Sequence, residues 1–113
     1  MAGRKLFTNK TDKEIYINIV LRRGLNPSDD ASMRGVVVLQ PYESSWRTYG
    51  DKDDVLINSF RIHFIPERGG PVESYYKVTE RGSEIDDRLN RYNAIDINYE
   101  NGAPSFSSWQ KNE

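Results

Sequence analysis

The chain has 113 residues, of which 29% are charged and 36% hydrophobic, and its 16 basic and 17 acidic side chains leave a net charge of -1. These values predict one soluble, globular domain that spans residues 1–113. The balanced charge gives no reason to expect nucleic acid as a partner, because phosphate binding needs a basic surplus or a basic face. The absence of cysteine excludes disulfides, thiol chemistry and a zinc–thiolate site.

Targeting signals are not apparent in the sequence. No apolar run has the length of a signal peptide, and none reaches the roughly 20 residues of a membrane span. We therefore expect no signal peptide and no transmembrane segment, and a cytoplasmic location is favoured. The tripeptide Asn9-Lys10-Thr11 matches the glycosylation sequon. We interpret it as a polar turn between two strands.

A two-residue alternation dominates the first half of the chain. In Glu14–Arg22, Ile15, Ile17, Ile19 and Leu21 share one parity, and polar residues fill most of the other. Because successive side chains of a strand point to opposite faces, this pattern predicts a strand with one buried face. The strands predicted in this half are Lys5–Thr8, Glu14–Arg22, Gly35–Gln40 and Ser44–Tyr49, with a loop over Gly24–Arg34.

The second half of the chain repeats the pattern and adds one helix. Ser83 precedes an acidic turn, and Ile85 and Leu89 lie four residues apart, which predicts a short helix over Ser83–Asn90. Asn101-Gly102 is a hairpin-turn dipeptide. The strands predicted in this half are Val55–Ile65, Val72–Thr79, Ala94–Glu100 and Ala103–Gln110.

About seven to nine short strands with regular turns predict an all-β, antiparallel β-sandwich with at most one short helix. A small closed β-barrel is the alternative. The tracts Leu6–Thr11 and Leu39–Ser44 are similar in general style to immunoglobulin-like and C2-like modules, although they carry no signature residues of either. The predicted core residues are Ile15, Ile17, Ile19, Val38, Trp46, Phe60, Ile62, Phe64, Tyr76, Ile95 and Ile97.

The sequence offers little catalytic machinery. His63 is the only histidine, and its parity places it on a face opposite Ile62 and Phe64. No G-x-S-x-G elbow accompanies it, and no spacing selects a pair of carboxylates. We therefore predict a non-catalytic protein.

Two acidic loops are candidate calcium ligands, since sandwich modules collect such ligands from loops at one end. The spacing departs from an EF-hand because Lys52 intrudes. No other cofactor is predicted. The candidate metal ligands are Asp29, Asp30, Asp51, Asp53 and Asp54.

Aromatic and basic side chains gather on the strand parity opposite the predicted core. Exposed tyrosine and arginine are typical of protein interfaces, and tyrosine also stacks on sugar rings. We predict a binding module for a protein partner or a second copy of the chain. The alternatives are a carbohydrate-binding, lectin-like module and a membrane-active or toxin-like β protein. The predicted binding residues are Tyr16, Asn18, Arg22, Arg47, Tyr49, Arg61 and Tyr75.

Overall fold

The structure is a computed structural model that describes residues 3–22, 30–50, 56–64, 72–100 and 102–112. This part of the chain contains eight strands and one short helix. In chain order they are β1 (Gly3–Asn9), β2 (Ile15–Arg22), β3 (Asp30–Leu39), β4 (Ser44–Tyr49), β5 (Ile57–Phe64), β6 (Val72–Lys77), α1 (Glu84–Asn90), β7 (Ala94–Glu100) and β8 (Ala103–Trp109).

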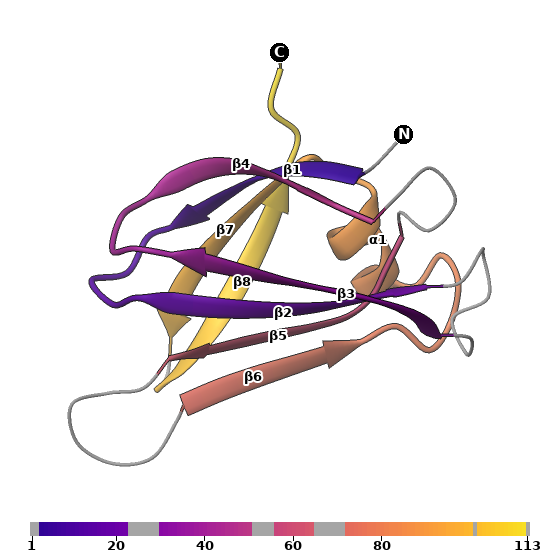
Figure 1. The fold of residues 1–113 in the computed structure, drawn as a ribbon, viewed down its shortest axis with the longest axis horizontal. Helices are drawn as coiled ribbons and strands as arrows, with labels where there is room; N and C mark the ends of the chain where they lie inside the picture. Colours follow the sequence, from indigo (N-terminus) through magenta and orange to yellow (C-terminus); the bar gives the residue numbers. More distant parts are fainter. Residues whose placement is uncertain (1–2, 23–29, 51–55, 65–71, 101, 113) are drawn as a thin grey trace.

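The strands form two four-stranded sheets that pack face to face (Figure 1). One sheet has the order β4-β1-β7-β8 and the other the order β3-β2-β5-β6. The predicted all-β sandwich is confirmed. The alternative of a closed barrel is wrong for the described strands, because they divide into two separate sheets. Neighbouring strands are antiparallel except β1 and β7, which run parallel.

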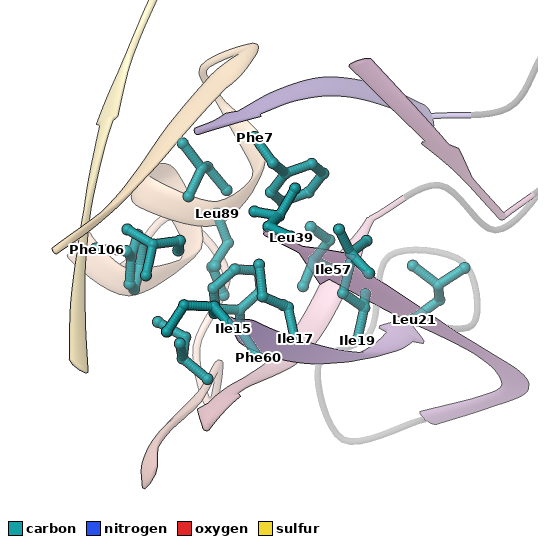
Figure 2. Close-up of a cluster of buried hydrophobic side chains, with 14 of the residues drawn as sticks. Phe7, Ile15, Ile17, Ile19, Leu21, Leu39, Ile57, Phe60, Leu89 and Phe106 are labelled. Atoms are coloured by element: carbon teal, nitrogen blue, oxygen red, sulfur yellow. The ribbon is translucent and has the colours of Figure 1, made fainter. Parts of the chain in front are cut away.

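The alternating residues of the two long central strands make the core. Ile15, Ile17 and Ile19 of β2 are buried, as is Phe60 of β5. Figure 2 shows these side chains pointing into the space between the sheets, where they meet side chains of the other sheet. The ring centroids of Phe60 and Phe106 lie 5.2 Å apart. One continuous apolar layer therefore holds the two sheets together.

The helix forms as predicted and closes one end of this core. Ser83 is its N-cap, and the Ser83 hydroxyl accepts a hydrogen bond from the Asp86 backbone N–H. Leu89 is fully buried, and Ile85 packs against the core cluster. The four-residue spacing of these two side chains directs both toward the sandwich.

The tripeptide Asn9-Lys10-Thr11, which matches the glycosylation sequon, has a structural role in the turn after β1. The Asn9 side chain is fully buried, and its Nδ2 group donates to the carbonyl oxygens of Lys13 and Gln40 at 2.6 and 3.0 Å. Its Oδ1 atom accepts from the Thr11 backbone N–H at 2.9 Å. The amide that glycosylation would modify is thus enclosed and fully hydrogen-bonded.

Three details of the first half differ from the predictions. β3 begins at Asp30, five residues before the predicted strand, and so includes residues that were assigned to a loop. Val37 and Leu39 face the core, whereas Val38 lies on the opposite face. Trp46 pairs with Leu6 on the outer side of its sheet and is half-buried rather than a core residue.

Candidate binding face

The outer side of the β3-β2-β5-β6 sheet gathers most of the predicted binding residues. The strand register places these side chains in rows that cross all four strands. The central row runs Val36–Asn18–Arg61–Tyr75, and the row beside it runs Val38–Tyr16–His63–Glu73. We call the eight residues of these two rows, together with Val20 and Ser59, the outer sheet face.

The centre of the outer sheet face is a hollow of about 290 Å³. Asn18, Ser59 and Arg61 line it with polar groups, and Val36 and Tyr75 stand at its two sides. Val36 is 65% exposed and Tyr75 is 53% exposed, although both are large apolar side chains. The hollow is therefore a polar depression between two exposed apolar side chains.

Charged and aromatic groups fix the geometry of this hollow. The Arg61 guanidinium carbon lies 5.3 Å from the centroid of the Tyr75 ring, a cation–π distance. The Arg61 Nε atom also lies 3.8 Å from a carboxylate oxygen of Glu73. These contacts hold the Arg61 side chain across the face of the sheet.

Tyr16 and His63 form a second ordered pair on the outer sheet face. Their rings stack with centroids 5.3 Å apart and planes 15° from parallel. The Tyr16 hydroxyl donates to the Glu14 carboxylate, which also accepts a hydrogen bond from Gln40 Nε2 at 2.7 Å. The hydrogen bonds from Tyr16 and Gln40 lower the pKa of Glu14, and the same contact raises the pKa of the Tyr16 phenol.

Four of the seven predicted binding residues therefore lie together: Tyr16, Asn18, Arg61 and Tyr75. Sequence reasoning missed Val36, Val38, His63 and Glu73, which complete the two rows. Val36 lies directly opposite Asn18, Val38 and His63 lie opposite Tyr16, and Glu73 lies opposite His63. Only the register between strands brings them together, and alternation within a single strand does not give that register.

Arg22 is not on the outer sheet face, and that prediction is wrong. The Arg22 side chain is 1% exposed, its Nη2 atom donates to Asp86 Oδ1 at 2.8 Å, and its Nε atom donates to Asn58 Oδ1 at 3.2 Å. Beyond Val20 the register with β5 shifts because Asn58 is an extra residue on that strand. Such a β-bulge re-aims the side chains that follow it.

Arg47 and Tyr49 belong to the other sheet, and the prediction that their side chains point outward is wrong. They share the parity of Ser45, which pairs with the buried Phe7. The Arg47 Nη2 atom reaches across the sandwich to the Val38 carbonyl oxygen at 3.2 Å. Tyr49 packs against the core cluster, and burial raises the pKa of its hydroxyl.

The predicted calcium ligands are mostly not placed by the structure. Asp29, Asp51, Asp53 and Asp54 lie outside the described residues, and Asp30 is placed only as the first residue of β3. In the described part of the chain, no group of three His, Asp or Glu side chains could hold a metal ion.

His63 has the predicted outward facing, on the same side as Arg61. The Nδ1 atom of His63 is buried and has no hydrogen-bond partner among the described residues.

A larger hollow of about 490 Å³ lies beside α1, where Arg22 and Asp86 are already paired with each other. None of the described helices is long and apolar enough to cross a membrane.

Comparison with known proteins adds no relative from which a function could be transferred. No protein-family model, curated protein or solved structure matches this chain.

Proposed function

We propose that this chain is a non-catalytic binding module that recognises protein through the outer sheet face, with a second copy of the chain as the partner. The observation that carries this proposal is the central row, in which the exposed Val36 and Tyr75 flank the polar pair Asn18 and Arg61. Tyrosine and arginine are enriched among the residues that dominate binding energies at protein interfaces.

The charges of the outer sheet face favour a second copy as the partner. Arg61 and Glu73 lie side by side on adjacent strands. In a two-fold symmetric contact, the same patch of each copy faces the other, so Arg61 of one copy can approach Glu73 of the second. The net charge of -1 adds little repulsion between two copies.

Sedimentation over a range from low micromolar to near-millimolar concentration tests this proposal. The mass should rise from the 13.1 kDa monomer toward twice that value. Tyr75→Ala should weaken the association, and Tyr42→Ala, which removes an exposed tyrosine outside the outer sheet face, should not. A constant monomer mass, or equal effects of the two substitutions, would contradict self-association through this face.

Carbohydrate binding is the second candidate, and the 290 Å³ hollow favours it. A sugar ring could stack on Tyr75 while Asn18 and Ser59 offer hydrogen bonds to its hydroxyl groups. A glycan array distinguishes the two functions, because a lectin binds a glycan and keeps its monomer mass. Tyr16→Ala and Tyr75→Ala should each reduce a glycan signal.

A further inference from the structure

Lys5 is a buried cation in a sheet that otherwise faces an apolar core. Its side chain is 4% exposed, and its Nζ atom donates to the backbone carbonyl oxygen of Tyr92. Among the described residues, no carboxylate forms an ion pair with it. Burial without a counter-charge lowers the pKa of Lys5 to about 8. A buried charge of this kind is costly unless something compensates it.

Lys5 lines a hollow of about 310 Å³, together with residues from the beginning of β1 and the end of α1. We call this space the Lys5 hollow. Figure 1 shows where β1 and α1 lie in the sandwich. Arg91 adds a second basic side chain to the wall of the hollow, and the described residues that line it include no Asp or Glu. Arg4 also lines the hollow, but its guanidinium carbon lies 4.2 Å from the centroid of the Trp46 ring, on the outer side of the sheet. The described lining of the Lys5 hollow therefore carries a net positive charge.

Some polar side chains that line the Lys5 hollow already have hydrogen-bond partners, and others have hydrogen-bonding groups left over. The Asn90 amide is hydrogen-bonded to the backbone of Ile57, and the Asn93 amide is hydrogen-bonded to the backbone of Lys111. Both asparagine amides are therefore already hydrogen-bonded to the backbone, and they line the hollow as fixed side chains. By contrast, the Tyr49 hydroxyl has no hydrogen-bond partner in the described part of the chain, and the Lys5 ammonium uses one of its three N–H groups.

The neighbouring 490 Å³ hollow differs in charge. It shares Leu56, Asn90 and Arg91 with the Lys5 hollow, but Asp86 and Asp87 also line it. Arg22 and Arg81 line it as well, but Arg22 is already paired with Asp86, and the two acids offset part of its positive charge. Of these two hollows, the Lys5 hollow is the one with cations and hydrogen-bond donors but no acids in its described lining.

We propose that the Lys5 hollow binds a small oxyanion of the phosphate type, with the Lys5 ammonium and the Arg91 guanidinium as counter-charges and the Tyr49 hydroxyl as a neutral donor. A phosphate monoester carries about -1.5 to -2 charges at neutral pH, which matches a site with two cations. Hydrogen bonds in which a partner is ionised are about twice as strong as neutral ones.

Calorimetric titration of the intact chain with inorganic phosphate at constant ionic strength tests this site. Phosphate should bind with one site per chain and should raise the melting temperature, because a ligand of the folded state stabilises it. Lys5→Met, which keeps the length of the side chain, should weaken binding roughly tenfold or more through loss of a charged hydrogen bond. Lys10→Met is the matched control, because Lys10 directly follows the other end of β1 and its exposed side chain pairs with Asp96, away from the Lys5 hollow.

The pH dependence gives a second readout that does not depend on a variant. The anion binds the ammonium form, so affinity should fall as the pH rises through about 8, the pKa of Lys5. The other charged and titratable groups around Lys5 are Arg4 and Arg91, Arg47 opposite it on β4, and the phenols of Tyr49 and Tyr92.

Three results would overturn the phosphate site. They are equal phosphate binding by Lys5→Met and the parent chain, equal binding of acetate or chloride, and no heat or melting shift with phosphate at neutral pH. If Lys5→Met does not fold, Arg91→Gln replaces it, since Arg91 is exposed and its substitution leaves the core intact.

Discussion

At the scale of single residues, the pair Arg22 and Asp86 shows how a charged side chain becomes structural. Burial alone would raise the pKa of the Asp86 carboxyl, but hydrogen bonds from the Gly82 backbone N–H, Arg22 and Asn90 outweigh it, and the pKa lies below its ordinary value of 3.8. The contact ties the end of β2 to the helix, two elements that are far apart in the sequence.

Asp86→Asn should destabilise the protein by about 3 kcal/mol at pH 7, because it leaves the Arg22 charge buried without its counter-ion. A carboxyl group whose pKa is lower in the folded state than in the unfolded chain stabilises the folded state at pH values above its unfolded pKa. This contribution is lost as the pH falls through the pKa of the folded state. The stability difference between the parent and Asp86→Asn should therefore shrink below pH 3.8. Urea unfolding at pH 7 and pH 3 measures both effects.

Asp87→Asn is the matched control for this experiment. It removes the same charge from the next position of α1, and the ion pairs of the described residues do not involve Asp87. Equal losses of stability in the two variants would mean that the Arg22–Asp86 contact contributes nothing specific.

At the scale of elements, one buried side chain anchors the short helix in the core. α1 has seven residues, a length at which an isolated helix is unstable in water. Leu89 is the fully buried residue that it inserts into the core. Leu89→Ala should cost roughly 2–5 kcal/mol through lost burial and a new cavity.

Hydrogen exchange combined with urea unfolding tests this attachment. The amides of α1 should lose protection in Leu89→Ala before those of β2. Glu84→Ala changes an exposed position of the same helix and should stay within about 0.5 kcal/mol of the parent. A loss of that small size for Leu89→Ala would contradict the packing of the helix.

The same scale shows which elements the sequence predicts and which it does not. β2 and β7 are predicted to within a residue, because one face of each is apolar and period-two alternation follows directly. The beginning of β3 is missed because its polar residues lack alternation. In β4 both parities carry an aromatic side chain, Trp46 and Tyr49, so the facing depends on the register with β1, which is a non-local contact.

The residues of the candidate site also divide into those that the sequence predicts and those that it does not. Tyr16, Asn18 and Arg61 are predictable because each lies within a strand whose opposite parity is clearly apolar. The opposite parity of Tyr75 is less distinct, since it holds the half-buried Val72, Ser74 and Tyr76. Arg22 is misplaced because a bulge is invisible to alternation. The Lys5 hollow is not predictable in this way, since its walls come from residues 4–5, 49, 56, 90–93 and 110, which only the tertiary fold brings together.

At the scale of the whole molecule, the first strand holds one sheet together. β1 lies between β4 and β7 and is the strand to which β4 is hydrogen-bonded within the sheet. Its Phe7 ring reaches the core and stacks on Phe60 of the opposite sheet at 6.5 Å. The parallel pairing of β1 with β7 joins residues about ninety positions apart, and closing so long a loop slows folding.

A chain that lacks residues 1–9 should therefore lose cooperative unfolding, because β4 would have no partner within its sheet and the inner edge of β7 would be open. A synthetic peptide with the β1 sequence, added in excess, should restore a cooperative transition by adding a strand to that edge. The same peptide with Phe7→Asp should fail, since it keeps the backbone hydrogen bonds but buries a charge beside Phe60. Circular dichroism during urea titration measures all three mixtures. A shortened chain that unfolds cooperatively without peptide, or rescue by the Phe7→Asp peptide, would show that the core does not need β1.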